Sequence, residues 1–306
     1  MQNHIRSPRW TQPSFASPLG SLTVVVDDCF GFADRFSLRH GNTISDMEVL
    51  DREPRPEAGV VLFHLKLAGT LLTGLSDLVV VSRDKEAVSP RSVSIRTSPV
   101  DSVKMVFTSD WHLLLPGGER CHQDQSRRYF ELIPKLNALS PDLVIHTGDL
   151  ITRYQGSGLS PLPDADIHRQ FAQAREILEL LEVPIFLVPG NHDVGFEICR
   201  RYWLDLAGKP WERETDDVSM VLGPVHFLIL DGFAHYDPVK YHMIDKSLTE
   251  DQLAWLEDSI AKTSAPRRVL AIHYDYTDQL MSRLQELSID AVFYGHGGSK
   301  DQAFFD

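Results

Sequence analysis

After about residue 100, short apolar segments alternate with longer segments whose apolar residues recur at helical spacing. Strands that alternate with amphipathic helices indicate a layered α/β domain. One of these helices opens with Thr249 and Gln252, which have the spacing of a capping box. The predicted strands lie at 104–110, 141–149, 183–193, 225–232, 268–275 and 290–296, and the predicted helices at 128–139, 167–181, 247–263 and 278–287.

The first hundred residues have a different pattern, in which β-branched segments are separated by polar turns that contain proline or glycine. The predicted strands are 22–28, 59–70, 77–84 and 91–98, whereas 48–59 is predicted to be a turn or loop. We therefore expect a β-rich, sandwich-like accessory domain over residues 1–100 and an α/β domain over residues 101–306. The accessory domain could shape substrate access or join two copies of the chain into a homo-oligomer.

Composition and charge narrow the class of protein. Hydrophobic residues make up 42% of the 306 residues, which supports a sizeable core, and the net charge of -13 disfavours nucleic acid or an anionic membrane as a partner. Three cysteines are present, and their spacing fits neither a zinc motif nor a disulfide framework. The first residues contain no apolar segment of a signal peptide, and we expect a cytoplasmic location.

Residues that can bind metals or transfer protons occur at the ends of five predicted strands. Open α/β sheets bind ligands beyond the carboxyl ends of their strands, so we expect these side chains to meet at one edge. They are Asp110, His112, Asp149, Asn191, His192, His273 and His296.

Taken singly, each of these residues has a more ordinary interpretation. Asp110 and His112 are two residues apart and point to the same face of an extended chain, but such a pair is more often a surface pair. Asp149 follows a glycine and could cap the next segment, and Asn191 could simply form a turn. A histidine at the end of an apolar strand, such as His273, is more often packed in the core.

The order of the motifs along the chain favours a functional site over these ordinary interpretations. D-x-H, GD, GNHD, a strand-end histidine and GH follow one another between Val103 and Gly298, and together they resemble the calcineurin-like metallophosphoesterase superfamily. The resemblance implies a four-layer sandwich, in which two sheets pack between helices, and a centre with two divalent or trivalent metal ions, with manganese, iron or zinc expected. The β-rich region lies outside the resemblance.

The resemblance also implies roles for single residues. The first metal would be bound by Asp110 and His112 and the second by Asn191, His273 and His296, with Asp149 bridging both. His192 would stay free of metal and face the substrate phosphate. Arg153 would contact the phosphate, although an exposed loop charge is an equal alternative. In members with that arginine an aspartate often precedes it, and here the position is Thr152.

Phosphoester chemistry explains such a layout. Two cations about 3.5–4 Å apart can neutralise phosphoryl oxygens and acidify a shared water, which then acts as a bridging hydroxide nucleophile. His192 could stabilise the transition state or protonate the leaving alkoxide. Asp193 could be a hydrogen-bond partner of an imidazole or could cap the turn.

The last motif departs from the family pattern. The family usually has a second histidine two residues after the first, and here Gly298 occupies that position. Glycine has no donor, so we expect the first metal site to be weak unless Asp301 or His122 replaces the ligand.

The predicted function is metal-dependent hydrolysis of a phosphodiester or a small phosphomonoester by a dinuclear centre. The alternative is a non-catalytic binding or scaffold protein that retains the fold. Gly298 and Thr152 favour the alternative, whereas the presence of Asp149, Asn191 and His192 weighs against it.

Overall fold

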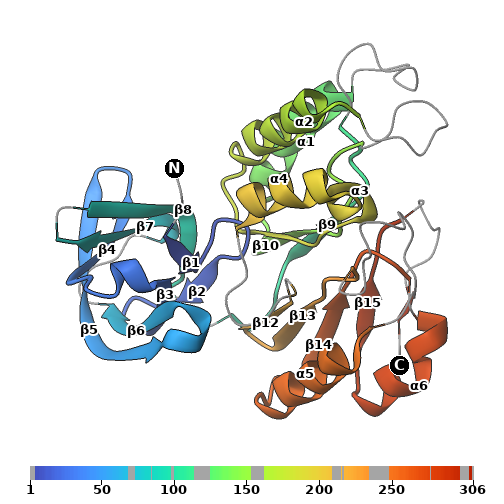
Figure 1. Cartoon of the computed structure of the whole chain (residues 1–306). Coiled ribbons are helices and arrows are strands. Elements are labelled where there is room, and N and C mark those ends of the chain that lie inside the picture. Colours follow the sequence, from blue (N-terminus) through green and yellow to red (C-terminus); the bar gives the residue numbers. More distant parts are fainter. Residues whose placement is uncertain are drawn as a thin grey trace. The chain divides into compact units, whose positions relative to one another are not determined.

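The computed structural model describes residues 4–67, 73–83, 85–97, 100–113, 125–152, 162–208, 215, 217–233, 248–275, 277–296 and 303–304. Contacts within the chain divide it into two compact units. Unit 1 comprises Met1–Pro99 together with Glu182–Phe186 and Ala207–Glu214, and unit 2 comprises the remaining residues. Figure 1 shows the secondary structure of both.

Unit 1 contains one eight-stranded sheet in the order β1-β3-β6-β5-β4-β7-β8-β2. Alternate side chains of its strands point inward, and Val24, Phe36, Leu65 and Val80 belong to the core that they form. The strands are β1 (Ile5–Ser7), β2 (Ser14–Ala16), β3 (Ser21–Asp27), β4 (Arg35–His40), β5 (Thr43–Arg55), β6 (Val60–Leu67), β7 (Gly74–Ser82) and β8 (Lys85–Ile95), with short 3₁₀ helices η1 (Asp28–Phe30) and η2 (Pro56–Ala58).

The prediction of a turn or loop over 48–59 is wrong, because most of this segment belongs to the long strand β5. The segment contains charged residues and two prolines, which obscure a strand in the sequence. β5 pairs with β4 only over Thr43–Met47, so its other edge is unpaired at Pro54, where it pairs with β6 alone. Within sheets, proline is typical of such edges, where its missing N–H can face away from the paired strand.

The rest of the chain contains two sheets flanked by helices, as predicted, and all their strands lie in unit 2 except most of the edge strand β11. One sheet has the order β11-β10-β9 and the other β12-β13-β14-β15-β16. The strands are β9 (Met105–Thr108), β10 (Leu143–His146), β11 (Ile185–Leu187), β12 (Val218–Leu222), β13 (Val225–Ile229), β14 (Arg267–Ala271), β15 (Ala291–Phe293) and β16 (Ala303–Phe304). The helices are α1 (Gln125–Leu139), α2 (Asp164–Leu178), α3 (Asn191–Val194), α4 (Glu197–Ala207), α5 (Glu250–Ala261) and α6 (Thr277–Glu286).

The two sheets of unit 2 form the inner layers of this α/β fold. Phe107 of β9 stacks on Phe293 of β15 with ring centroids 3.6 Å apart. Helices α1, α2 and α4 lie beside the smaller sheet, and α5 and α6 lie beside the larger one (Figure 1). All residues of β10 and β13 are buried, which explains why both strands appear in the sequence as continuous apolar segments.

The capping box at the start of α5 is confirmed. The Thr249 side chain accepts a hydrogen bond from the Gln252 backbone N–H at 2.9 Å, and the Gln252 side chain accepts one from the Thr249 N–H at 3.2 Å. Helix α4 was not predicted, although Cys199, Trp203 and Leu206 are buried at helical spacing and could have revealed it. No helix in the described part of the chain has the length and apolar character needed to cross a membrane.

Candidate metal centre

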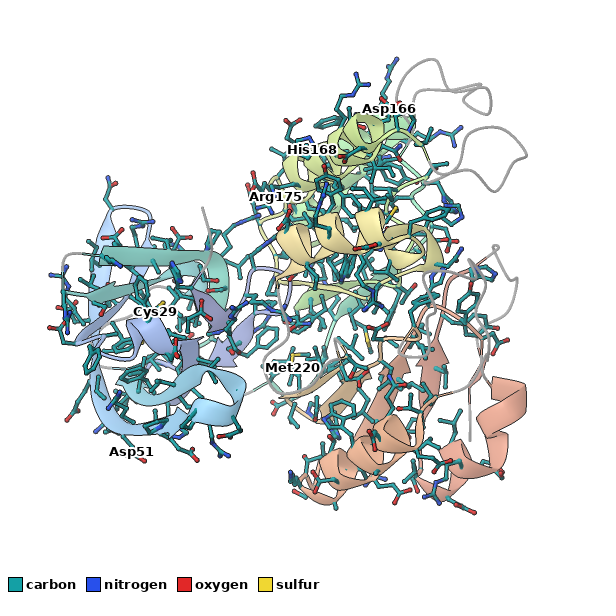
Figure 2. The ribbon with its side chains drawn as sticks, viewed as in Figure 1. Cys29, Asp51, Asp166, His168, Arg175 and Met220 are labelled. Carbon is teal, nitrogen blue, oxygen red and sulfur yellow. The ribbon has the colours of Figure 1, made fainter. Side chains whose placement is uncertain are left out.

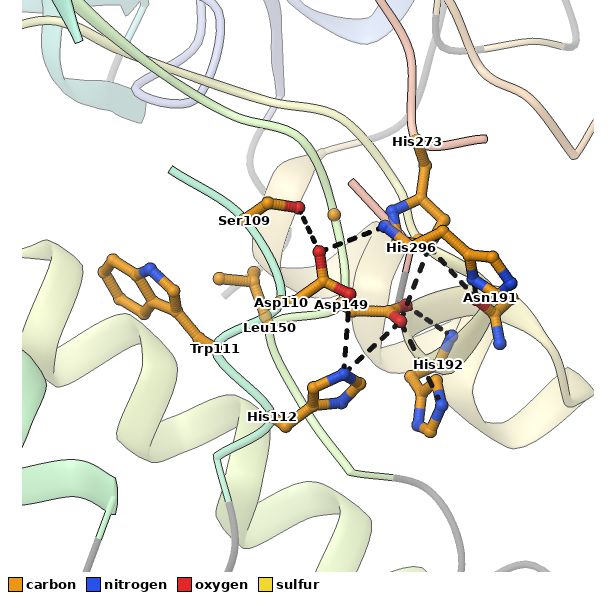
Figure 3. A network of polar contacts seen from close by, with 12 residues as sticks. Ser109, Asp110, Trp111, His112, Asp149, Leu150, Asn191, His192, His273 and His296 are labelled. Atoms are coloured by element: carbon orange, nitrogen blue, oxygen red, sulfur yellow. Dashed lines mark hydrogen bonds and ion pairs between the residues drawn. The ribbon is translucent and has the colours of Figure 1, made fainter. Parts of the chain in front are cut away.

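The strands of unit 2 bring most of the predicted site residues to one place (Figure 3). β9 and β10 run parallel, and so do β14 and β15, so their carboxyl ends point in common directions. Each predicted residue follows one of these ends or begins α3 after β11. The side chains that meet are those of Asp110, His112, Asp149, Asn191, His192, His273 and His296.

The carboxylate of Asp149 is the common neighbour of three imidazoles. Its Oδ2 lies 3.4 Å from His273 Nε2, 3.7 Å from His112 Nε2 and 4.0 Å from His192 Nε2. His112 Nε2 is also 3.6 Å from Asp110 Oδ1. Asp149 is only 1% exposed, so this carboxylate lies at the bottom of the site with the imidazoles around it.

His273 identifies a point where a cation fits. Its Nδ1 lies 2.7 Å from the carbonyl oxygen of Thr147, which can only accept, so Nδ1 carries the hydrogen. When a metal takes the place of a proton on Nε2, the lone pair of this nitrogen faces Asn191 Oδ1 at 3.0 Å and Asp149 Oδ2 at 3.4 Å. Three electron-rich atoms that face one another are stabilised by a metal ion between them.

His296 extends this side of the site. Its Nδ1 lies 3.1 Å from Asn191 Oδ1, and its ring is 5.3 Å from that of His273. Within the described residues, two groups of candidate metal donors share one carboxylate: His112 with Asp149 and His192, and Asp149 with His273 and His296. Imidazole and carboxylate donors in two groups that share Asp149 fit a pair of metal ions.

Four of the predicted ligands have a left-handed backbone. The φ angles are 53° at Asp110, 45° at His112, 59° at Asp149 and 59° at His296. Residues other than glycine seldom adopt this conformation, and it concentrates at functional sites where the surrounding structure holds it in place. The backbone turns sharply at each of these positions, so the side chains point into the site.

Glycines allow the loops of the site to approach one another closely. Gly148 has a φ of 99°, and a Cβ there would lie 2.7 Å from both the Cα of Gly190 and the Nδ1 of His273. A Cβ on Gly190 would collide with Asp149, and one on Gly295 would collide with Ser109. The glycines of the GD, GN and GH motifs therefore have a steric reason to be there.

Asp193 holds two of these loops together, and sequence reasoning missed this role. Its buried carboxylate accepts hydrogen bonds from the backbone N–H groups of Asp149 at 2.8 Å, Leu150 at 2.9 Å, Ile151 at 3.3 Å and Gly190 at 2.9 Å. It is neither the imidazole partner nor only the turn cap that the sequence suggested. The partners are backbone groups 42 to 44 residues away as well as the adjacent turn, so no local spacing signals the role.

The Asp110 carboxylate accepts hydrogen bonds from Ser109 and from the backbone of His296. The Ser109 hydroxyl donates to Asp110 Oδ2 at 2.5 Å, and the backbone N–H of His296 donates to the same oxygen at 3.1 Å. Burial raises the pKa of Asp110, but the hydrogen bonds from His112 and Ser109 outweigh it and hold the pKa at about 2. The carboxylate is therefore ionised at neutral pH and available to a cation.

Burial and neighbouring charges also set the pKa values of the other acidic groups and imidazoles in the site. Burial opposes ionisation of Asp149, yet the facing imidazoles of His273, His192 and His112 lower its pKa. Burial would lower the pKa of His273, but the nearby Asp149 carboxylate outweighs it and raises this pKa. In the same way, Asp110 outweighs burial at His112 and raises its pKa. Burial and then the charge of Asp149 raise the pKa of Asp193 to about 7. Negative charge is thus concentrated on Asp149 and Asp110.

His146 lies behind the site, in the core. It is fully buried, its Nδ1 accepts the backbone N–H of Gly148 at 3.1 Å, and its ring meets Trp111 edge-on at 4.9 Å. Its Nε2 has no hydrogen-bond partner among the residues that the structure describes. Burial lowers the pKa of His146 to about 3, so this ring stays neutral.

Several predicted residues lie outside the described residues: Arg153, Gly298, Asp301 and His122. Thr152, which precedes Arg153, is buried, and its backbone N–H donates to Gln170 Oε1 at 2.7 Å.

The chain is similar to several known proteins. The model of the calcineurin-like phosphoesterase family matches residues 103–297. A protein from Arcobacter nitrofigilis, described as a probable glycerophosphodiester phosphodiesterase GpdQ, is 27% identical over 175 residues, which are 56% of this chain and 56% of the relative. The chain therefore spans about half the length of that relative.

Among solved structures, a dimetal phosphatase from Danio rerio is similar over 64% of this chain and 81% of its own, with a TM-score of 0.48 and 13% identity.

Proposed function

The chain belongs to the calcineurin-like phosphoesterase family, and from this premise we propose that it is a metal-dependent phosphodiesterase with a dinuclear centre. The observation that carries the proposal is the convergence of His273 Nε2, Asn191 Oδ1 and Asp149 Oδ2, three atoms that can bind one cation together. The second group of donors, which shares Asp149, supports a second cation. A scaffold has no chemical need for either group.

We propose that Asp110, His112 and Asp149 hold the first metal, and that Asp149, Asn191, His273 and His296 hold the second. Manganese, iron or zinc would suit this mixture of carboxylate, imidazole and amide donors. The first site is expected to bind more weakly, because the resemblance implies a histidine where the sequence has Gly298. Metal analysis that finds both sites equally full would contradict this asymmetry.

Metal ions held by these residues would supply Lewis acidity that stabilises charge on the phosphoryl group and activates water. Asp149 would serve both sites, since its buried carboxylate is shared by both groups. His192 would act on the substrate itself: its side chain is 17% exposed, and its ring lies 4.6 Å from that of His112. Its imidazolium would stabilise charge on the phosphate or protonate the leaving alkoxide. Arg153 is proposed as a further phosphate contact.

The substrate class is proposed to be a small phosphodiester. The description of the relative from Arcobacter nitrofigilis, a probable glycerophosphodiester phosphodiesterase, supports a diester over a monoester. The net charge of -13 disfavours long nucleic acids, which would be repelled outside the metal centre.

The test is hydrolysis of bis-p-nitrophenyl phosphate by the full chain with added Mn²⁺, compared with the monoester p-nitrophenyl phosphate. His192→Ala should lower kcat by at least about 100-fold, the usual contribution of a positioned acid, while the protein keeps its metal. His168→Ala is the matched control, because His168 is an exposed histidine on α2. Its activity should equal that of wild type.

Two outcomes would contradict parts of this proposal. If His192→Ala loses metal in the same proportion as activity, His192 is a ligand, which its place beside Asp149 and His112 also permits. If the wild-type chain hydrolyses neither substrate with manganese, iron, zinc or nickel, the scaffold alternative is correct.

A further inference from the structure

A second group of metal donors lies in unit 1, on strands that the catalytic proposal does not use. It consists of His4, Asp27 and Cys29, and we propose that these three residues bind a divalent cation of the Zn²⁺ class. His4 precedes β1 and Asp27 ends β3. Cys29, which is labelled in Figure 2, lies in η1. Because β1 pairs with β3, His4 lies beside Asp27 although the two are 23 residues apart in the sequence.

The two distances from His4 to the other donor atoms suit a tetrahedral ion. His4 Nδ1 lies 3.1 Å from Asp27 Oδ2 and 3.6 Å from Cys29 Sγ, and all three donor atoms lie within 4.8 Å of one another. Zinc binds nitrogen and oxygen at about 2.0–2.2 Å and sulfur at about 2.3 Å, so neighbouring donors in a tetrahedral site are about 3.3–3.6 Å apart. Closing around an ion would need only small movements of these side chains.

The use of a single nitrogen distinguishes this group from a catalytic relay. In a Cys–His–Asp relay, the thiol and the carboxylate contact opposite nitrogens of the ring, so that the carboxylate orients the base. Here both the carboxylate and the sulfur face Nδ1. One nitrogen can donate only one hydrogen, so hydrogen bonding alone serves the two acceptors poorly, whereas a cation between the three atoms serves all of them.

Neighbouring residues hold the donors in position. The backbone N–H of Asp27 donates to the carbonyl of His4 at 2.9 Å, which fixes the two main chains. Arg6 Nε donates to Asp27 Oδ1 at 2.6 Å, which leaves Oδ2 directed at His4. The His4 ring stacks on Phe30 with centroids 4.7 Å apart and planes at 23°, which orients Nδ1. Such outer contacts are typical of metal sites, where they orient the ligands.

The choice of metal follows from the donors. A thiolate beside an imidazole selects a borderline or soft cation over Mg²⁺ or Ca²⁺, and three protein ligands leave the fourth position to water. Side-chain exposures of 30% for His4 and 18% for Asp27, with Cys29 exposed, leave access for the ion. The predicted phosphoesterase ligands contain no sulfur, so a metal–thiolate signal distinguishes the two kinds of site.

The experiment is a titration of the full chain with Co²⁺, followed by the thiolate-to-cobalt charge-transfer absorption. Wild type should develop this band to saturation with one equivalent of sulfur-bound Co²⁺, and added Zn²⁺ should displace it. Cys29→Ser should abolish the band, and His4→Ala should weaken Co²⁺ binding at least about tenfold, since it removes one of three ligands. His64→Ala is the control, because His64 lies on β6 of the same unit and outside the group.

Phosphoesterase activity and circular dichroism should be unchanged in Cys29→Ser, which would show that the fold is intact. Two results would overturn the proposal: no thiolate band in the wild-type chain, or a band that persists in Cys29→Ser. If Cys29→Ser does not fold, His4→Gln provides the same test through the affinity for Co²⁺.

Discussion

Asp193 and Asp149 hold each other's loops through reciprocal hydrogen bonds. The Asp193 carboxylate accepts the backbone N–H of Asp149 at 2.8 Å, and the Asp149 carboxylate accepts the backbone N–H of His192, next to Asp193, at 2.8 Å. The carboxylate at the centre of the proposed metal site therefore depends on a second carboxylate that binds no metal in the proposal.

Replacing Asp193 with asparagine tests this dependence. Asn keeps one acceptor oxygen but turns an NH₂ group toward backbone N–H donors, so at least one buried donor loses its partner. The free energy of unfolding should fall by about 1–3 kcal/mol, and the affinity for Mn²⁺ should fall as well. Urea denaturation and calorimetric titration measure the two effects.

Asp258→Asn is the control for that change, since Asp258 is an exposed carboxylate paired with Lys262. Removing its charge should alter stability by no more than about 0.5 kcal/mol. Mn²⁺ affinity that is equal in Asp193→Asn and wild type would contradict the role of Asp193.

Gly295→Ala should disturb the metal site by displacing residues that pack against Gly295. The new Cβ would collide with Ser109, and it would lie 2.7 Å from Asp110 Oδ2 and 3.1 Å from His273 Nδ1. We expect weaker Mn²⁺ binding and a loss of turnover, measured in the same titration and assay. Gly41→Ala is the control, because no atom lies within 4 Å of a Cβ there. Its φ of 57° should cost about 1–2 kcal/mol of stability and leave activity unchanged. Normal Mn²⁺ binding in Gly295→Ala would show that the loop can move away without harm.

The buried His146 predicts a dependence of stability on pH. Its pKa is about 3 in the folded chain and 6.5 in the unfolded one, so only the unfolded chain takes up this proton between these values. The stabilisation is complete above pH 6.5 and is lost as the pH falls toward 3. In metal-free protein, wild type should lose stability relative to His146→Gln by about 1.4 kcal/mol per pH unit in this range. Parallel curves for the two proteins would show that His146 takes up its proton in the folded state as well.

The cap of α5 predicts a change confined to stability. Thr249→Ala removes the oxygen that accepts the Gln252 N–H and should cost about 1 kcal/mol. Thr249→Ser keeps the hydroxyl and should restore most of that loss. Thermal unfolding measures both variants, and turnover should be the same in each. A Thr249→Ala protein as stable as wild type would mean that water replaces the cap at no cost.

Periodicity and motif order predicted much of unit 2 because both are local properties of the sequence. The strands before Asp110, Asp149 and His296 are short and apolar, and their polar ends follow directly. The long strand β5 was missed because its side chains are mostly exposed, so pairing with β6 rather than burial defines it. Asp193 and the group around His4 depend on partners distant in sequence, which no single-chain pattern reveals.

The left-handed backbone at Asp110, His112, Asp149 and His296 has a consequence for how this centre can change over evolution. Asparagine tolerates that conformation at least as well as aspartate, whereas valine, isoleucine and threonine do not. Exchange among Asp, Asn, His and Gly at these positions can therefore alter the charge and number of ligands while the loops keep their course. Metal preference can drift through such exchanges without added backbone strain, whereas an aliphatic substitution would remove the ligand and strain the backbone at once.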